Sequence, residues 1–318
     1  MENTKLVIAV PAYNEEEMLP ITIPAMLEVL QRLINAKKVS DDSRLLFIND
    51  GSKDNTWPDI LEAQARDYHV TGISFSRNYG HQNALIAGLQ TAQDADAIIT
   101  IDADLQDDIN AIDEMVDRFN EGYEVVYGVR NNRDTDTAFK RGSAMAFYKA
   151  MEILGAKTIP NHADFRLLSQ RAAKAVLEFP ERNMFLRGVV PLVGFNSTNV
   201  YYSRNERQAG ESKYPLSKML KFAMDGITSF STVPLRMILW LGIVSVLVAI
   251  GLIIMTLVQK MGAGHTVTGW SSLMISIWFV GGAQLISLGV LGEYLGKVFF
   301  EVKQRPRFFI QNDAYSNK

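Results

Sequence analysis

The sequence has no cysteine among its 318 residues, which excludes disulfide bridges, thiolate metal sites and thiol nucleophiles. It also lacks the glycine pattern G-x-G-x-x-G after its first apolar run, and G-x-x-x-x-G-K-[ST] is absent throughout. These absences disfavour a dinucleotide oxidoreductase and a P-loop ATPase. The net charge is only −3, so no strong field predicts nucleic acid as a partner. The N-terminal stretch lacks a basic start and a long apolar core, so we expect no signal peptide there.

Charged residues are missing from two long stretches near the C-terminal end. Residues 237–259 contain none, and residues 261–292 contain only the titratable His265. Because about 20 apolar residues cross the hydrocarbon core of a bilayer, we predict transmembrane helices at 236–259 and 269–293. Two buried helices of a soluble protein are the alternative, although tandem runs of this kind are unusual in soluble domains.

Basic residues flank the outer ends of both predicted spans. They are Lys218, Lys221 and Arg236 before the first span, and Lys297, Lys303, Arg305 and Arg307 after the second. The short connection between the spans holds only Lys260 and His265. Since basic residues favour the cytoplasmic side, we predict a multi-pass protein of the cell (plasma) membrane. Its soluble part, both termini and the tail at 294–318 are then cytoplasmic.

A basic and apolar segment connects the soluble part to the first predicted span. Residues 214–235 place their apolar side chains roughly on one helical face, which predicts an interfacial juxtamembrane helix. An ordinary packing helix is left open as the alternative. Residues 295–310 are also basic and aromatic, and they are a second candidate for contact with the membrane surface.

The first part of the chain alternates strand patterns with helix patterns. Strand-like apolar runs begin at residues 5, 43, 70, 95 and 123, and apolar residues at helical spacing follow the first four. This order predicts parallel β-α-β units and a doubly wound sheet. Ligands of such sheets bind beyond the carboxyl ends of the strands. Each predicted strand ends in polar residues, so we expect those residues to gather along one edge.

The stretch IITIDADLQDDI (98–109) ends an apolar strand pattern with four carboxylates, those of Asp102, Asp104, Asp107 and Asp108. Carboxylates this close repel one another and raise one another's pKa values. A hard divalent cation such as Mg²⁺ or Mn²⁺ would compensate that repulsion. A polar turn that caps the next helix is the alternative, because aspartate is a favoured N-cap.

Six stretches in order resemble one family. They are VPAYNEE (10–16), NDGSKDNT (49–56), SRNYGHQNALIAGL (76–89), DADLQD (102–107), DFRLL (164–168) and RQAGESKY (207–214). Together they resemble glycosyltransferase family 2, and within it the polyprenyl-phosphate branch of dolichol-phosphate mannosyltransferases and bacterial bactoprenol glucosyltransferases. The apolar stretches followed by LGEYLGKVFFEVKQRP (291–306) are similar to the bacterial members. The sequence departs at Asp108, where a proline often follows DLQD in this family.

The resemblance implies an α/β fold of the GT-A (Rossmann-like) type with a mostly parallel sheet at residues 1–213. It implies that Asp102, Asp104 and Gln106 hold Mg²⁺ or Mn²⁺ on the diphosphate of a nucleotide sugar, with Asp107 and Asp108 as weaker candidates. The residues implied for the nucleotide sugar are Pro11, Ala12, Tyr13, Glu15, Asp50, Asn78, Gly80, His81, Asp102, Arg207, Ser212 and Lys213. Loop capping by the turn residues, a structural role for His81 and a solvated surface at 207–213 stay open.

The acceptor side of the reaction is also implied by the resemblance. Asp164 matches the residue proposed as catalytic base. A lipid monophosphate is already mostly ionised near pH 7, because its second pKa is about 6, so Asp164 could instead only orient the acceptor. A salt bridge to Arg166 is the structural alternative. Guanidinium and ammonium groups suit a phosphate, and the candidates for the acceptor phosphate are Arg130, Arg133, Lys140 and Arg141.

The function implied is metal-dependent, inverting transfer of one hexose to undecaprenyl phosphate at the cytoplasmic membrane face, as in the biosynthesis of surface polysaccharide. The expected donor is UDP-glucose. GDP-mannose, UDP-N-acetylglucosamine, UDP-galactose and a UDP-aminoarabinose derivative are the alternatives. A processive synthase is disfavoured because Q-x-x-R-W is missing, and a non-catalytic membrane scaffold is the rival class. Small residues at 281–283 suit helix packing, so a homo-oligomer is left open.

Overall fold

The computed structural model describes residues 4–131, 162–182, 186–203, 232–263 and 269–316. The chain divides into two compact units. The sheet unit comprises residues 1–148, 158–215 and 305–318, and the helical unit comprises residues 149–157 and 216–304.

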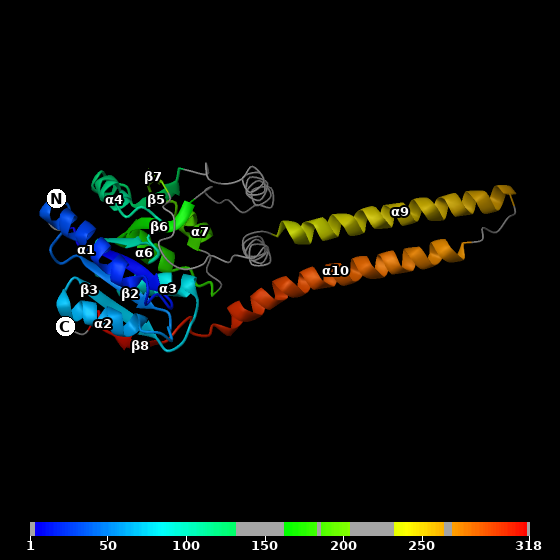
Figure 1. The fold of residues 1–318 in the computed structure, drawn as a ribbon. Helices are drawn as coiled ribbons and strands as arrows, with labels where there is room; N and C mark the ends of the chain where they lie inside the picture. The colour runs from blue at the N-terminus through cyan, green and yellow to red at the C-terminus, as the bar shows by residue number, and fades with distance from the viewer. Residues whose placement is uncertain (1–3, 132–161, 183–185, 204–231, 264–268, 317–318) are drawn as a thin grey trace. The chain divides into compact units, whose positions relative to one another are not determined.

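The described residues of the sheet unit form an eight-stranded sheet in the order β7-β5-β6-β4-β1-β2-β3-β8 (Figure 1). The strands are β1 (Leu6–Ala12), β2 (Arg44–Asn49), β3 (Val70–Phe75), β4 (Ala97–Thr100), β5 (Val125–Arg130), β6 (His162–Ser169), β7 (Ser197–Tyr202) and β8 (Ile310–Asp313). Strand β1 pairs in parallel with β2 and β4, β2 with β3, and β5 with β7. The five strands predicted from the sequence are present as β1 to β5, and the mostly parallel sheet is confirmed. Strands β6 and β8 run antiparallel to their neighbours and were not predicted.

Helices cover the sheet because its central strands are apolar on both faces. Every residue of β1 is buried, as expected for a parallel strand with helices on both sides. The helices of the sheet unit are α1 (Leu19–Asn35), α2 (Thr56–Arg66), α3 (His81–Thr91), α4 (Ala111–Asn120), α6 (Gln170–Leu177), α7 (Leu186–Val189) and the short 3₁₀ helix η1 (Val190–Val193). Helix α1 buries Leu19, Ile23, Met26, Leu30 and Leu33, whose spacing defines one helical face.

The described part of the helical unit consists of two long helices, α9 (Val233–Ala263) and α10 (Trp270–Lys303). Large apolar side chains of α9 are exposed, for example Leu239 at 63% and Trp240 at 64%. Among the described residues one segment, Val233–Leu252, is long and apolar enough to cross a membrane, with a mean hydropathy of 2.3. The predicted span at 236–259 falls within α9, and the predicted span at 269–293 begins one residue before α10, at its N-cap Gly269. Only the first is supported by length and hydropathy. The two-span topology is therefore not confirmed.

The chain after α10 returns to the sheet unit. Strand β8 pairs antiparallel with β3, with Ile73 opposite Asp313 and Phe75 opposite Ile310. No strand is predicted in this segment from the sequence, because IQND (310–313) shows no clear apolar alternation. The other predicted domain boundaries stay predictions. Most of the predicted juxtamembrane helix at 214–235 lies outside the described residues.

Candidate active site

The loops after β1 and β2 are fastened to each other at the carboxyl edge of the sheet. The backbone N–H of Asn14 donates to Ser52 Oγ over 2.9 Å, and the N–H of Lys53 donates to Asn14 Oδ1 over 3.0 Å. The N–H of Glu15 donates to Thr56 Oγ1 over 2.8 Å. Four residues of the predicted donor pocket lie here: Pro11 and Ala12 are buried in β1, Tyr13 is exposed and Glu15 is half-buried. Their binding role stays a prediction.

Asp50 holds the next loop of this edge. Its Oδ1 accepts the N–H of Tyr79 over 2.6 Å, and its Oδ2 accepts the N–H of Gly80 over 2.9 Å. Burial raises the pKa of Asp50, and these two hydrogen bonds offset part of that increase. Gly51 has a φ of +65°, and a Cβ there would lie 2.2 Å from the carbonyl carbon of Arg77. Loop capping, the structural alternative for Asp50, is therefore present, and its contact with a nucleotide stays a prediction.

The loop 76–80 carries further predicted donor residues into α3. Asn78 is exposed, and Gly80 adopts a φ of +92° at the N-cap of α3. His81 is the first residue of α3, and its side chain remains 41% exposed. The loop thus places Asn78 and His81 at the edge where the sequence analysis expects a ligand.

In the segment after β4, partly exposed side chains alternate with buried ones. Asp102, Asp104 and Gln106 are half-exposed, whereas the residues between and after them, Ala103, Leu105 and Asp107, are buried. Thr22 fixes this path, because its Oγ1 donates to the carbonyl oxygen of Ala103 over 2.6 Å. Three oxygen-bearing side chains of one short segment are therefore partly exposed.

This set of side chains fits a hard divalent cation in its chemistry. Burial raises the pKa of Asp102 to about 6; His81 opposes that increase, and three neighbouring carboxylates add to it. Within the described part of the chain, no group of three histidine, cysteine, aspartate or glutamate side chains is arranged to hold a metal. The available set is two carboxylates and one amide, which are ligands that Mg²⁺ and Mn²⁺ accept.

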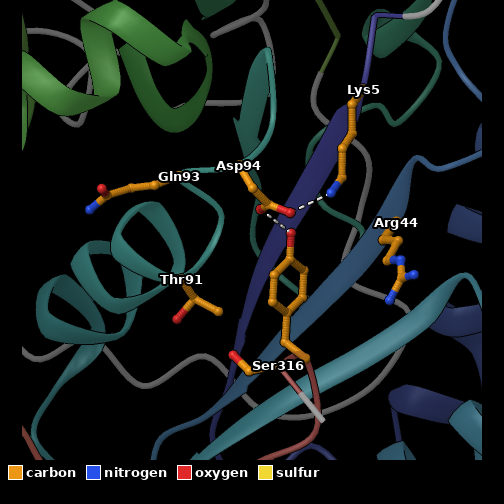
Figure 2. Close-up of a pocket in the computed structure, with 7 residues that line it drawn as sticks. Lys5, Arg44, Thr91, Gln93, Asp94 and Ser316 are labelled. Atoms are coloured by element: carbon orange, nitrogen blue, oxygen red, sulfur yellow. Dashed lines mark hydrogen bonds and ion pairs between the residues drawn. The ribbon is translucent and has the colours of Figure 1, made fainter. Parts of the chain in front are cut away.

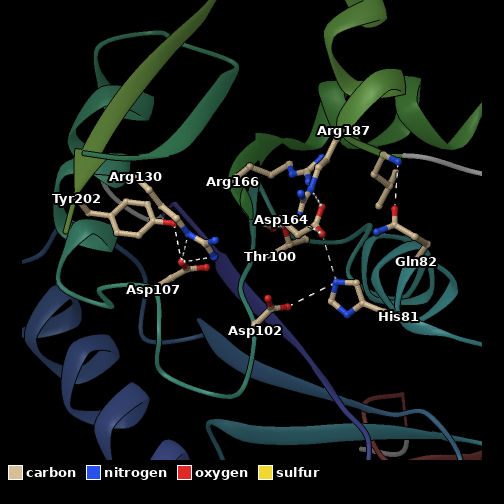
Figure 3. Close-up of polar contacts among 11 residues, drawn as sticks. His81, Gln82, Thr100, Asp102, Asp107, Arg130, Asp164, Arg166, Arg187 and Tyr202 are labelled. Carbon is tan, nitrogen blue, oxygen red and sulfur yellow. Dashed lines mark hydrogen bonds and ion pairs between the residues drawn. The ribbon is translucent and has the colours of Figure 1, made fainter. Parts of the chain in front are cut away.

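Asp107 is the acceptor of a buried hydrogen-bonded cluster (Figure 3). Its Oδ1 accepts the Tyr202 hydroxyl over 2.7 Å, and the Arg130 Nε and Nη2 over 2.9 and 2.8 Å. The cluster joins the segment after β4 to the ends of β5 and β7. Arg130, a predicted ligand of the acceptor phosphate, keeps 28% of its side chain exposed. Asp108 accepts from the backbone and side chain of Asn110, both over 3.0 Å, so it holds the turn before α4. It is not the N-cap of α4, which is Asn110 with no side-chain cap, so the N-cap alternative for Asp108 is wrong.

Tyr202→Phe should destabilise the protein by about 1–3 kcal/mol, because the charged and buried Asp107 would lose one hydrogen-bond donor. The ring would still pack against Phe165, whose centroid lies 5.4 Å away. Thermal unfolding of the full chain measures this effect. Tyr201→Phe is the matched control, since Tyr201 is 57% exposed and should tolerate the change. Equal melting temperatures for both variants would contradict a stabilising role of the Tyr202 hydroxyl.

Asp164 lies at the centre of a second buried cluster, in β6 (Figure 3). It forms an ion pair with Arg166, and its Oδ2 accepts Arg187 Nη2 over 3.0 Å. His81 Nε2 lies 3.4 Å from Asp164 Oδ2 and 3.5 Å from Asp102 Oδ1. His81 thus bridges the predicted metal segment and the predicted base.

The electrostatics of this cluster keep Asp164 ionised. Burial alone would raise its pKa, but Arg187, the hydrogen bond from His81 and Arg166 together hold that pKa well below its usual range. The pKa of His81 is raised: burial lowers it, but the hydrogen bond with Asp164 and the charges of both carboxylates outweigh burial. The alternative of a salt bridge to Arg166 is confirmed. A carboxylate of low pKa is a weak proton acceptor, so the base role stays a prediction that this environment disfavours.

Arg187 is a site residue that the sequence analysis missed. It belongs to the short helix α7, which is tied to α3 because the backbone N–H of Leu186 donates to Gln82 Oε1 over 3.1 Å. No local pattern in MFLRGVV (184–190) marks this arginine, and only the fold brings it to Asp164. Six predicted site residues lie outside the described residues, so their roles stay predictions: Arg133, Lys140, Arg141, Arg207, Ser212 and Lys213.

A polar pocket lies at the opposite edge of the sheet (Figure 2). It has a volume of about 320 Å³ and is lined by Lys5, Arg44, Thr91, Gln93, Asp94, Tyr315 and Ser316. Lys5 comes just before β1, and Arg44 begins β2. The pocket therefore faces the amino ends of the strands, away from Asp102 and Asp164.

The fold and the family comparison agree on the class of protein. The model of the family described as Glycosyl transferase family 2 matches residues 7–177. With the mostly parallel mixed sheet and the acidic segment after β4, this defines a glycosyltransferase of GT-A fold. The chain belongs to glycosyltransferase family 2.

Curated relatives match nearly the whole chain. The uncharacterized glycosyltransferase YkoT of Bacillus subtilis is 49% identical over 98% of this chain and 93% of its own length. The SfII prophage-derived bactoprenol glucosyl transferase of Shigella flexneri is 40% identical over 98% of this chain and 99% of its own length. Among solved structures, glucosyl-3-phosphoglycerate synthase of Mycobacterium tuberculosis has a TM-score of 0.43 and 16% identity, over 71% of this chain and 78% of that chain.

Proposed function

We propose that this protein transfers a single glucose from UDP-glucose to undecaprenyl phosphate at the cytoplasmic face of the membrane, in a metal-dependent and inverting reaction. The observation that carries the proposal is the set of partly exposed oxygen-bearing side chains of Asp102, Asp104 and Gln106 in one short segment. His81 lies between Asp102 of this segment and Asp164. The name bactoprenol glucosyl transferase, given to relatives of about the same length, supports both the sugar and the acceptor.

Asp102, Asp104 and Gln106 are the residues that would hold Mg²⁺ or Mn²⁺. The cation would neutralise the diphosphate of the donor and so stabilise the departing nucleotide. A phosphate oxygen of the lipid attacks the anomeric carbon, the bond from that carbon to the diphosphate breaks, and UDP leaves with the bonding electrons. The attack inverts an α-linked donor to a β-linked product.

The protein's own groups orient this reaction. A lipid phosphate with a second pKa of about 6 needs little help from a base near pH 7. Asp164 stays ionised and fixes Arg187 and His81 by its contacts with them. His81 Nε2 also lies 3.5 Å from Asp102 Oδ1, so this cationic group stands beside the segment that we assign to the donor diphosphate. Positioning and charge, rather than proton removal, are the contributions that this cluster favours.

A membrane anchor would keep the enzyme close to its lipid acceptor, because a soluble enzyme would rarely meet a lipid confined to a bilayer. Helix α9 contains the apolar segment Val233–Leu252, and we propose that α10 provides a second span at 269–293. Both termini and the sheet unit are then cytoplasmic. A homo-oligomer built on small residues of α10 remains compatible with this arrangement.

The test is a transfer assay with the purified full-length chain. It contains undecaprenyl phosphate, MnCl₂ or MgCl₂, and one radiolabelled donor at a time: UDP-glucose, GDP-mannose, UDP-N-acetylglucosamine or UDP-galactose. We expect label in the lipid phase from UDP-glucose alone, and we expect EDTA to abolish it. Label from another donor would refute glucose but keep the reaction. A protein that binds UDP yet labels no lipid would refute the acceptor, and one that binds no nucleotide would favour the scaffold.

A further inference from the structure

The segment after α10 fastens itself along the sheet unit at several points. We call Arg307–Tyr315 the C-terminal clasp. Arg307 Nη2 donates to the carbonyl oxygens of Phe179 and Glu181 over 2.7 and 2.9 Å, just beyond α6. Strand β8 then pairs with β3 along its length. The clasp ends where the Tyr315 hydroxyl donates to Asp94 Oδ1 over 2.6 Å, at the pocket of Figure 2.

The middle of the clasp contacts the loop that leads to His81. The backbone N–H of Ser76 donates to the carbonyl oxygen of Phe309 over 3.1 Å. The Phe308 ring stacks on Phe75 with centroids 4.9 Å apart, and the Phe309 ring meets Tyr79 edge-on at 6.5 Å. The clasp therefore touches both the first residue and the fourth residue of the loop 76–80.

Tyr79 connects this contact to the candidate active site. Its backbone N–H donates to Asp50 over 2.6 Å, and the Arg77 guanidinium lies 4.4 Å from the centre of its ring. The loop contains Asn78 and Gly80, which are predicted to contact the nucleotide sugar, and it ends at His81. Asp50 thus holds the backbone of the loop at Tyr79 and Gly80, and the clasp contacts Ser76 and the Tyr79 ring.

We propose that the C-terminal clasp positions the loop 76–80 for the donor nucleotide, with Phe309 as its positioning residue. The inference rests on the proposed function, since it assigns the loop to a nucleotide sugar. The clasp begins four residues after the end of α10 at Lys303, so the donor site is complete only when the chain beyond the helical unit has returned to β3.

Phe309 and Tyr315 of the clasp differ in burial, and this difference allows a positioning role to be tested apart from a stabilising role. Phe309 is 57% exposed, so its ring contributes little buried apolar area, whereas Tyr315 is 9% exposed and hydrogen-bonded at the far end. Removing the Phe309 ring should loosen the loop without unfolding the sheet unit. Changing Tyr315 should weaken the same clasp far from the loop.

The experiment compares Phe309→Ala with Tyr315→Phe in the full-length chain. Three quantities are measured: hydrogen exchange of the peptide that covers residues 76–83, the Kd of UDP with Mn²⁺ by calorimetry, and the melting temperature. For Phe309→Ala we expect faster exchange in this peptide, a Kd raised about tenfold, equivalent to about 1.4 kcal/mol, and a melting temperature near that of the wild type. For Tyr315→Phe we expect a lower melting temperature with exchange of this peptide and Kd unchanged.

The outcomes separate this inference from the proposed function. Unchanged exchange or an unchanged Kd in Phe309→Ala would overturn the inference, and so would a Kd that rises equally in both variants. In that last case the clasp would be merely structural. A wild-type protein that binds no UDP would refute the proposed function and the donor role of the clasp together, while the exchange data would still report whether the clasp holds the loop.

Discussion

Replacing Asp104 with asparagine is expected to lower the rate of sugar transfer about a hundred- to a thousandfold, the usual effect of losing one group that stabilises transition-state charge. The substitution removes one of the two partly exposed carboxylates, those of Asp102 and Asp104, in the segment after β4. The amide can still accept the backbone N–H of Gln106, which lies 3.2 Å from Asp104 Oδ1. Folding should therefore be preserved, and the loss should fall on the cation and on the diphosphate that it holds.

Two measurements check this result. Initial rates across a Mn²⁺ series should show a higher half-saturating concentration for the variant, and direct titration with Mn²⁺ should show weaker binding. Asp108→Asn is the matched control, because it makes the same charge change four residues away. Its Oδ1 would still accept from Asn110, so we expect wild-type rates. An Asp104→Asn variant with wild-type Mn²⁺ binding would remove Asp104 from the metal site.

Replacing Asp164 with asparagine is expected to cost about 3–5 kcal/mol of stability, because removing one partner of a buried ion pair leaves the other charge uncompensated. Here two guanidinium groups, those of Arg166 and Arg187, would lose their counter-charge. For a domain of this size the loss corresponds to a fall in melting temperature of roughly 10 °C. Transfer activity should fall as well, since Arg187 and His81 would lose their common acceptor.

The pH dependence of this effect follows from the depressed pKa of Asp164. A carboxyl group whose pKa is lower in the folded state stabilises the protein above its unfolded value, near 3.8, and loses that contribution as pH falls through the folded value. The difference in stability between wild type and Asp164→Asn should therefore shrink below about pH 4. It should also fall as pH rises through the raised pKa of His81, because Asp164 contributes to raising that pKa. Thermal unfolding of both proteins at several pH values measures it.

A matched control separates this cluster from ordinary surface pairs. Glu62 pairs with Arg66 on α2, where both side chains are largely exposed. Glu62→Gln should leave the melting temperature close to that of the wild type, because exposed pairs contribute little. If the difference between the wild-type and Asp164→Asn stabilities shrank as pH fell from about 6 to about 5, Asp164 would take up a proton in that range, and the base role would regain support.

Much of the fold could be predicted from local sequence patterns. Apolar runs of strand length gave the five strands β1 to β5, and the helical spacing of apolar residues gave α1 and the helices after β2, β3 and β4. The acidic segment was found from its composition alone. In the structure Asp102, Asp104 and Gln106 are half-exposed and alternate with buried residues, and their role as metal ligands stays a prediction.

Other parts of the site could not be predicted, because their partners lie far apart in the chain. Asp107 meets Tyr202, which is 95 residues away, and Asp164 meets Arg187, which is 23 residues away. Neither pair has a periodic signal. Strand β8 was missed for the same reason: an edge strand takes its hydrogen bonds from β3, and four mostly polar residues carry little apolar pattern of their own.

The sequence by itself determined the class of fold, the gathering of polar residues at the carboxyl edge of the sheet and the oxygen-rich segment suited to a divalent cation. These features depend on periodicity and composition, which are local properties of a chain. Only the tertiary structure decided that Asp107 accepts hydrogen bonds from Arg130 and Tyr202, that Asp164 pairs with two guanidinium groups, and that the chain after α10 returns to β3. Those outcomes depend on which side chains packing brings together, and charge, burial and pKa follow from that neighbourhood rather than from position in the sequence.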